Sequence, residues 1–355
     1  MSMTGIDILE NDIQANYPGV LEILLQDRTT EENIFWATDS YASLNKEGEP
    51  SQYGFYDQIT VEKISGANTQ VVQPRAAKTK EEQAQRTKDK AEVFTPAWVC
   101  NSQNNLIDEA WFERKDGLFN SANPDNPYGW INNEKKIIFP DTEGKTWKDY
   151  VADIRLEITC GEAPYLCNIY DAVAGGKNED TIHRIGILDR KLRIVSENAK
   201  DSKEWILWGK IALRATYGFE WQGDNLLLAR EAMLYTFADH YIARFGEKTF
   251  RQNKSRMMKD VAYIISWNIW QMDGLKYGLP GYTPDPAIEP KKDDLPGLFD
   301  FSQDEGPHII KPRERLCIIK DFFDGVDIHK PSLKAQDFND EQAPTYTFKS
   351  TINQK

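Results

Sequence analysis

Apolar side chains recur every three or four positions between residues 225 and 245, which predicts a long helix with one apolar face. Asp224 stands directly before this stretch, where a carboxylate can cap the start of a helix. The preceding residues 215–221 form a short apolar run that is typical of a buried strand. A strand, a sharp acidic turn and a long helix make up half of a doubly wound α/β unit.

Weaker patterns of the same kind occur on both sides of this unit. Two more strands are predicted, one over residues 154–159 and one in the aromatic and β-branched stretch 263–271, which leads to Asp273. A helix is predicted over residues 97–112, because Pro96 stands at its entrance and proline is favoured there. The pattern therefore indicates an α/β sheet in the second two-thirds of the chain.

Four further segments complete the predicted organisation. Residues 115–148 and 277–312 are rich in residues that favour loops. Residues 316–323 are predicted as a fourth strand of the sheet, and the chain from Asp324 onward has few apolar anchors, which predicts a poorly ordered tail. The glycine pair in residues 174–180 predicts an insertion between the first two strands.

The segment 78–90 is charged throughout and has no apolar stripe. Such a segment is typical of a solvated helix or a flexible linker. The alternative is a hinge or a contact with a nucleic-acid backbone, because the segment has five positive charges in thirteen residues, although its acidic neighbours weaken that interpretation. These charges belong to Lys78, Lys80, Arg86, Lys88 and Lys90. We expect residues 1–90 to form an N-terminal extension that ends in this linker.

Composition narrows the classes of function. The 355 residues suffice for one large α/β domain with additions or for two modest domains. No apolar run approaches the ~20 residues that cross a bilayer, and no signal peptide is visible, so we expect a soluble, cytoplasmic protein. The formal net charge of −13 disfavours tight binding of DNA by the whole surface. A separate basic subunit could supply such affinity.

Cysteines and histidines do not form a metal-binding pattern. Without a Cys-x-x-Cys pair, and with every histidine isolated, the spacing does not predict a zinc site. Buried, unreactive thiols are expected instead. The cysteines are Cys100, Cys160, Cys167 and Cys317.

Three polar elements follow the three predicted strands in order. The first strand runs through Glu157 into a turn at Gly161, where a missing side chain lets the backbone approach a ligand closely. The second strand ends in Glu220, a carboxylate that can accept hydrogen bonds from both hydroxyls of a ribose. The third leads to Asp273, which can accept a bond from an adenine amino group. Glu220 beside a helix start and Asp273 before a glycine are also typical of a helix cap and a plain turn.

With Phe94-Thr95-Pro96 ahead of them, these elements resemble the ordered motifs of gamma-class adenine-specific DNA methyltransferases, the modification subunits of restriction–modification systems. The chain also resembles Bacteroidetes proteins described as restriction endonuclease subunit M. The resemblance implies a Rossmann-like fold that binds S-adenosylmethionine, with an N-terminal extension. It implies a methyltransferase-like domain over residues 91–323 and a tail over 324–355. The implied cofactor-binding residues are Phe94, Thr95, Pro96, Glu157, Thr159, Gly161, Glu220 and Asp273.

The sequence departs from the family at two places. Glu157 replaces the usual aspartate of the glycine motif, and Ala163 stands where a second glycine is expected. No Asn-Pro-Pro-aromatic tetrad, which holds the flipped adenine in these enzymes, follows Asp273. Asp321 and Phe323, at the end of the predicted fourth strand, are the remaining candidates for the catalytic positions.

Two functions follow from the resemblance, and a third is less favoured. The chain is expected to be a DNA adenine methyltransferase-like modification subunit that works on DNA with a partner of a restriction system. The alternative is a non-catalytic, cofactor-binding or degenerate subunit of a restriction or phage-defence complex. An unrelated nucleotide-binding enzyme is disfavoured, because no Gly-x-Gly-x-x-Gly run is present.

Overall fold

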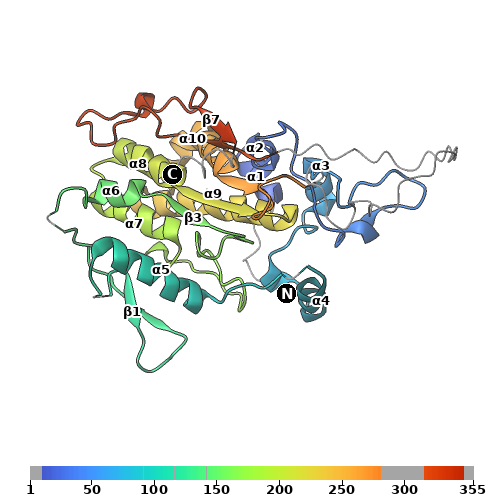
Figure 1. The fold of residues 1–355 in the computed structure, drawn as a ribbon, viewed down its shortest axis with the longest axis horizontal. Helices are drawn as coiled ribbons and strands as arrows, with labels where there is room; N and C mark the ends of the chain where they lie inside the picture. Colours follow the sequence, from blue (N-terminus) through green and yellow to red (C-terminus); the bar gives the residue numbers. More distant parts are fainter. Residues whose placement is uncertain (1–9, 91, 116, 141, 281–315, 348–355) are drawn as a thin grey trace, which may run out of the picture.

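A parallel three-stranded sheet lies at the centre of the fold (Figure 1). The computed structural model describes residues 10–90, 92–115, 117–140, 142–280 and 316–347. The sheet has the order β3-β4-β5, from β3 (Arg155–Glu157), β4 (Thr216–Glu220) and β5 (Ile269–Gln271). Both neighbouring pairs are parallel. The strands predicted at residues 154–159 and 215–221 are thereby confirmed.

Ten α-helices make up the largest share of regular structure in the described chain. The helices predicted at residues 97–112 and 225–245 are confirmed as α5 and α9, the latter beginning two residues earlier. The helices are α1 (Glu10–Asn16), α2 (Val20–Leu25), α3 (Val61–Ile64), α4 (Lys80–Lys90), α5 (Ala97–Phe112), α6 (Trp147–Ala152), α7 (Ile187–Asn198), α8 (Ser202–Arg214), α9 (Gly223–Phe245) and α10 (Glu247–Asn268). The protein is therefore a mixed α/β structure with small sheets.

The third strand is shorter than the sequence predicts. Residues 263–268 belong to the last turns of α10, and the chain becomes extended only at Ile269. Val261, Ile264 and Ile265 are fully buried in that helix. Aromatic and β-branched residues suit a buried helix as well as a strand, so periodicity alone did not separate the two.

The two faces of the central sheet are covered differently. Ile269 belongs to the main hydrophobic core together with α9 and α10. Side chains alternate between faces, and on the opposite face Phe219 and Trp270 form a smaller cluster with Cys317. Leu156, on this second face at the open edge of β3, is 44% exposed. Part of one sheet face is therefore accessible in the described structure.

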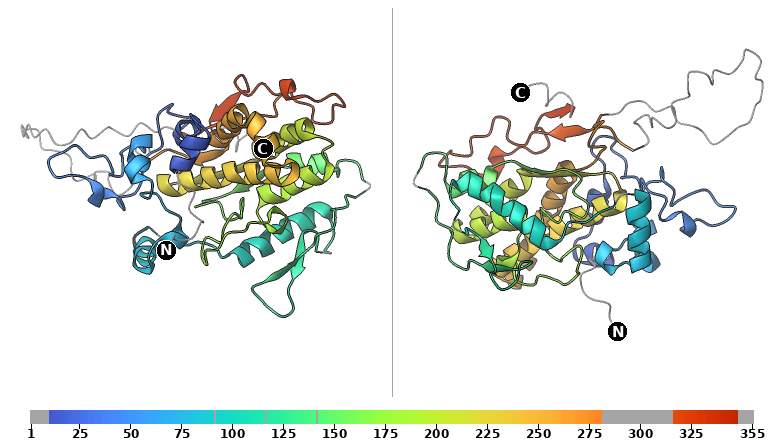
Figure 2. Two further views of the ribbon diagram at one scale, coloured as in Figure 1. Left: turned by 180° about the vertical axis from the view of Figure 1, so that it is seen from behind. Right: turned by 60° about the horizontal axis from the view of Figure 1, so that its bottom comes forward.

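The predicted fourth strand is not part of this sheet. Residues 318–320 form β6 (Ile318–Lys320), which pairs antiparallel with β7 (Thr345–Thr347). The other hairpin joins β1 (Asn120–Ala122) and β2 (Trp130–Asn132), inside the region predicted as loop. Figure 1 and the left view of Figure 2 show the two hairpins at opposite edges of the molecule, with α9 running between them.

One hydrophobic core joins the described parts of all three predicted segments. It includes Leu21 and Leu25 of α2 and also Phe338 beyond β6. Arg214 forms an ion pair with Asp340 at 2.6 Å, which attaches the C-terminal segment to the end of α8. The prediction of a poorly ordered tail is therefore wrong for residues 324–347. Among the described residues, no helix combines the length and apolar character needed to cross a membrane.

Candidate functional site

The carboxyl ends of β3, β4 and β5 surround a pocket of ≈ 710 Å³. In a parallel sheet these ends lie along one edge, where ligands of α/β proteins usually bind. Seven of the eight predicted cofactor-binding residues line the pocket. They are Phe94, Thr95, Glu157, Thr159, Gly161, Glu220 and Asp273. Pro96 is the residue that precedes α5 and is not among the lining residues.

The turn after β3 uses a left-handed backbone at alternate residues. Thr159, Gly161 and Ala163 have φ angles of 51°, 53° and 62°. A side chain added at Gly161 would place its Cβ 3.3 Å from the Phe94 ring. The ring of the Phe-Thr-Pro segment thus packs directly over the glycine, so the residues predicted to act together are in contact.

Glu220 connects the tips of two strands. Its Oε2 accepts a hydrogen bond from the Gly161 amide at 2.9 Å, and its Oε1 accepts one from the Gln222 amide at 3.1 Å. Burial raises the pKa of Glu220, and these amide bonds oppose the rise. The hydrogen bond from the Gln222 amide is typical of an acid beside the start of a helix, which was the alternative role given to Glu220 from the sequence. The carboxylate therefore fixes the glycine turn while remaining at the pocket wall.

Glu157 is a buried acid of the pocket wall with one unpartnered oxygen. Its side chain belongs to a residue that is only 9% exposed, and its Oε2 has no hydrogen-bond partner in the described structure. Burial raises its pKa well above the usual value, while the amides of Tyr165 and Leu166 oppose that rise and the charge of Glu220 adds to it. This Oε2 oxygen is itself buried, so it lies within the pocket wall and not on its surface.

Asp273 shapes the turn that follows β5. Its Oδ1 accepts hydrogen bonds from the amides of Leu275 and Lys276, at 2.8 and 3.0 Å. This is the plain-turn role that the sequence left open. The bonds use one carboxylate oxygen, so Oδ2 is not committed to the turn.

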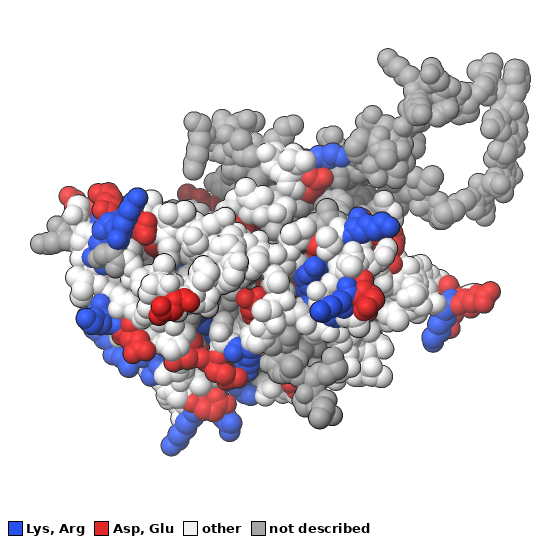
Figure 3. Space-filling model, turned by 90° about the horizontal axis from the view of Figure 1, so that it is seen from below, with Lys and Arg blue, Asp and Glu red and all other residues white. Residues whose placement is uncertain are grey.

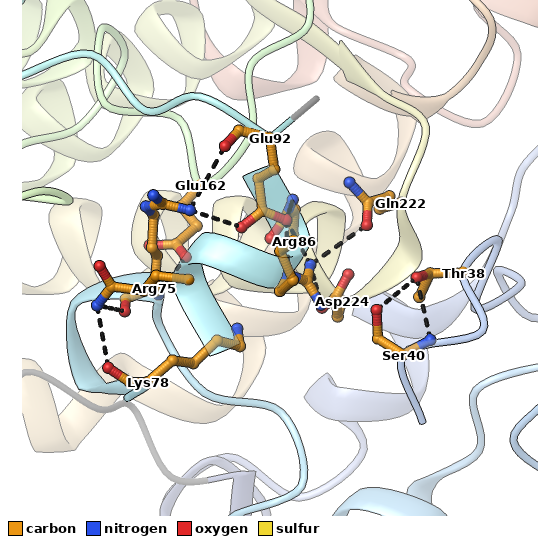
Figure 4. A network of polar contacts seen from close by, with 12 residues as sticks. Thr38, Ser40, Arg75, Lys78, Arg86, Glu92, Glu162, Gln222 and Asp224 are labelled. Atoms are coloured by element: carbon orange, nitrogen blue, oxygen red, sulfur yellow. Dashed lines mark hydrogen bonds and ion pairs between the residues drawn. The ribbon is translucent and has the colours of Figure 1, made fainter. Parts of the chain in front are cut away.

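A buried network attaches α4 to the same site (Figure 4). Arg86 of α4 forms ion pairs with Glu92 at 2.6 Å and with Asp224 at 2.8 Å. Tyr41 donates a hydrogen bond to Asp224 at 2.7 Å. Burial alone would raise the pKa of Asp224, but the charges of Arg86 and Lys78 and the hydrogen bonds to Asp224 together outweigh it, and the pKa is lowered.

Two predictions about this network are wrong. The segment 78–90 is not a fully solvated helix, because Arg86 is only 5% exposed. Asp224 does not cap α9: Gln222 occupies the cap position, and Asp224 lies in the first turn with its carboxylate directed to Arg86. Arg86 and Asp224 are more than a hundred residues apart in sequence, and the charge pattern of α4 gave no sign of their contact.

The sequence also missed several residues of the pocket wall. Glu92 lines the pocket and accepts a hydrogen bond from the Asn225 amide group at 3.3 Å. Tyr165, Trp221 and Gln222 line it as well. Trp221 and Gln222 directly follow Glu220, so the position after a strand-end acid was the signal that could have indicated them.

The candidate catalytic residues lie away from the pocket. Asp321 receives a hydrogen bond from the amide of Phe323 at 2.9 Å, and the Phe323 ring packs edge-on against Phe338. Between them, Phe322 lies beside the guanidinium of Arg214, which precedes β4. This segment therefore borders the amino end of β4, whereas the pocket lies at its carboxyl end. Asp321 and Phe323 do not line the pocket shared by the predicted cofactor-binding residues, because β6 pairs with β7 and not with the central sheet.

Charge is distributed unevenly between the pocket and the surface. The lining residues include four acids, Glu92, Glu157, Glu220 and Asp273, and among the described lining residues none is Lys, Arg or His. On the face shown in Figure 3, basic and acidic side chains are intermixed and separated by uncharged areas. That face therefore offers no continuous basic surface for a nucleic-acid backbone.

Comparison with protein-family models, with curated proteins and with solved structures yields no match to this chain. The interpretation of the pocket consequently depends on its own geometry and chemistry.

Proposed function

We propose that the pocket binds S-adenosylmethionine and that the chain is a modification subunit of the adenine DNA methyltransferase type. The observation that carries the proposal is the convergence of the Gly161 turn, Glu220 and Asp273 at one pocket, with Phe94 packed over the glycine. These elements are far apart in the chain, yet they meet at one pocket in the order expected of an adenosine site.

Each wall of the pocket suits one part of the cofactor. Glu220 would accept hydrogen bonds from the ribose hydroxyls with lone pairs that the amides of Gly161 and Gln222 leave free. The uncommitted oxygen of Asp273 would accept from the adenine amino group. Glu157, an acid of the pocket wall, would lie nearest the methionine ammonium. The residues present therefore fit the group, which supplies an electrophilic methyl.

Within the described structure, the residues at the pocket suit binding of the cofactor, and the candidates for holding the target base are not at the pocket. A flipped adenine needs an acceptor and an aromatic surface beside the methyl group, and Asp321 and Phe323 lie near the amino end of β4. We infer that a partner polypeptide supplies contacts to DNA and to the target base. The second candidate, a cofactor-binding subunit without catalysis of its own, is favoured by this same displacement.

Isothermal titration calorimetry tests the cofactor claim. The full chain is expected to bind S-adenosylmethionine, and Glu220→Ala is expected to weaken binding at least tenfold, because a lost charge-assisted hydrogen bond costs about 1.5–3 kcal/mol. Asp321→Ala is the matched control, since it removes an acid outside the pocket and should bind normally. Absence of binding by the unaltered chain would refute the proposal.

Methyl transfer is tested separately. Transfer of a radiolabelled methyl group to DNA is measured with the chain alone and with the products of neighbouring genes. Transfer that requires a partner supports the modification subunit. Cofactor binding without transfer in either setting favours the non-catalytic subunit.

A further inference from the structure

The strand order of the central sheet is that of half a doubly wound sheet. The strands β3, β4 and β5 follow one another outward in chain order, so the first of them lies at an edge. In a complete sheet of this kind the first strand is central, and the second half begins on its other side, at the crevice where ligands bind. Among the strands that the structure describes, none occupies that position beside β3.

The backbone of β3 presents hydrogen-bonding groups at this open edge. Arg155 donates its amide hydrogen to the carbonyl oxygen of Ala215, on the side of β4. Successive residues of a strand direct their backbone groups to opposite sides, so the amide and carbonyl of Leu156 point away from β4. Because β3 pairs with β4 alone in the described sheet, these groups are available to an additional strand.

The side chains beside the open edge are apolar and largely uncovered. Ile154, Leu156 and Ile158 stand at alternate positions along β3 and its flanks, which places them on one face. They are 62%, 44% and 65% exposed. Parallel sheets are normally covered on both faces, and exposed edges usually carry charges that prevent pairing. These three positions carry no charge, so the edge and the adjoining face suit the addition of a strand.

The apolar surface continues around the mouth of the pocket. Ile158 lines the pocket together with Val93 and Leu275, which are 77% and 89% exposed. With Ile154 and Leu156, these side chains present an apolar area on the order of several hundred Å², a size that marks interaction sites on soluble proteins. A polypeptide seated on this surface would cover β3 and border the pocket at the same time.

Charge indicates the kind of polypeptide that fits. The chain has a formal net charge of −13, and the face shown in Figure 3 has no continuous basic surface. A partner that contacts DNA needs clustered lysines and arginines. Opposite charges speed the association of such a partner with this chain, whereas two copies of the acidic chain repel each other. Charge complementarity therefore favours a basic partner over self-association.

We propose that a basic partner polypeptide adds an extended strand, parallel to β3, to this open edge and packs alternate apolar side chains over Ile154, Leu156 and Ile158. Strand addition to a sheet edge is a recurrent mode of polypeptide recognition. The carboxyl ends of parallel strands meet at one edge of the sheet, so the residues after the added strand would lie at the pocket. There they would supply the acceptor and the aromatic surface for the target adenine, and this last step rests on the proposed function.

Amide hydrogen exchange of the full chain tests the open edge. Relative to its intrinsic rate, the Leu156 amide is expected to exchange at least tenfold faster than the Arg155 amide, which bonds into the sheet. The products of neighbouring genes, added one at a time, are the probes, and one of them should slow exchange at Leu156 at least tenfold. Slow exchange in the chain alone, or no protection by any of these products, would overturn the proposal.

A lysine at the edge provides a second test. Leu156→Lys should weaken binding of the protecting product at least tenfold in calorimetry, because an unpaired charge would be buried under the added strand. Leu44→Lys is the matched control, since Leu44 is 45% exposed and lies in a short 3-10 helix outside the sheet, and binding should be unchanged. Ile154→Lys replaces Leu156→Lys if circular dichroism shows that the latter folds poorly.

Two results would contradict strand addition at this edge. Unweakened binding by a folded lysine variant would show that the partner docks elsewhere. A dimer of the chain alone in sedimentation velocity, dissociated by Leu156→Lys, would identify a second copy as the occupant.

The failure of this proposal is distinguishable from failure of the proposed function. Leu156 does not line the pocket, so Leu156→Lys should bind S-adenosylmethionine within about twofold of the unaltered chain, while methyl transfer with the partner falls at least tenfold. If the cofactor does not bind and the partner still protects Leu156, the proposed function fails and strand addition stands. If the cofactor binds and no product protects the edge, strand addition alone fails.

Discussion

At the scale of single residues, the turn after β3 is the least ordinary part of the backbone. Thr159 and Ala163 adopt left-handed conformations that usually require glycine, with φ angles of 51° and 62°. A β-branched residue in this region is rare, since the conformation costs roughly 1–2 kcal/mol without glycine. The sequence suggested that Ala163 replaces a family glycine, and the structure explains why a glycine suits that position. Strain of this kind often accompanies binding sites.

We predict that Thr159→Gly stabilises the protein by about 1 kcal/mol. The substitution relieves the left-handed strain, and the side chain is exposed, so little packing is lost. Urea unfolding measures the change. Gly161→Ala is the opposite case, because its Cβ would approach the Phe94 ring and its φ is 53°, and it should destabilise by about 1 kcal/mol. A destabilised Thr159→Gly protein would show that the strain argument is wrong.

Glu162, the neighbour of the glycine, predicts how stability changes with pH. Burial raises its pKa to about 7, although the Arg75 amide and the Tyr170 hydroxyl donate hydrogen bonds to it. The folded state therefore binds a proton that the unfolded state releases near pH 4.5. The contribution of Glu162 to stability is complete below that pH and is lost as the pH rises to about 7.

The corresponding measurement is the free energy of unfolding between pH 4.5 and 7. Glu162→Gln is always neutral, so the decline with pH should be shallower than in the unaltered protein, by on the order of 2–3 kcal/mol over this range. Other buried acids, such as Glu157 and Glu220, contribute in both proteins and cancel in the comparison. Parallel curves for the two proteins would contradict the prediction.

At the scale of elements, α4 shows what a charge pattern leaves undetermined. Its sequence is typical of a solvated helix, and most of its side chains are exposed. Among the side chains of α4 that the structure describes, only Arg86 is buried, between Glu92 and Asp224. One buried arginine among several exposed charges produces no periodicity, so the attachment could not be predicted. In contrast, α5 and α9 were predicted well because proline, apolar spacing and length agreed.

We predict that Arg86→Met destabilises the protein by about 3–5 kcal/mol, because it leaves Asp224 buried without the charge of Arg86 and leaves Glu92 only its longer pair with Arg75 at 3.4 Å. Chemical unfolding gives the magnitude, and limited proteolysis near α4 reports whether the helix detaches. Lys88→Met is the control, since Lys88 is exposed on the same helix and should change stability by less than about 0.5 kcal/mol. Similar effects of both substitutions would argue against the network as the anchor of α4.

At the scale of the whole molecule, local patterns predicted the strands that flank the pocket and failed where pairing is long-range. The residue types of β6 suit any strand, and nothing in residues 316–323 specifies β7 as the partner instead of the central sheet. For the same reason Asp321 and Phe323 were placed at the wrong end. The pocket residues were predicted because their order along the chain matches the order of the strand ends.

The position of β6 leads to a prediction about binding. Asp321→Asn and Phe323→Ala should leave the affinity for S-adenosylmethionine within about twofold of the unaltered protein, because neither residue lines the pocket. Phe323→Ala should still lower the unfolding free energy by about 1 kcal/mol or more, since its ring packs against Phe338. Loss of affinity in a folded Asp321→Asn protein would contradict this prediction and would indicate that Asp321 lies close to the cofactor site.

The hydrogen bonds between Arg230 and the end of α2 have a practical consequence for truncation of the protein. Its guanidinium, fully buried in α9, donates hydrogen bonds to the carbonyl oxygens of Leu24 and Gln26 at the end of α2, and to that of Ile269 in β5. A fragment that begins at residue 91 would remove two of these acceptors from a buried cation and expose to water the surfaces of α9 and α10 that α2 covers. Truncation at the boundary suggested by sequence would therefore yield an insoluble or unfolded product, and the binding half must be studied with its first ninety residues attached.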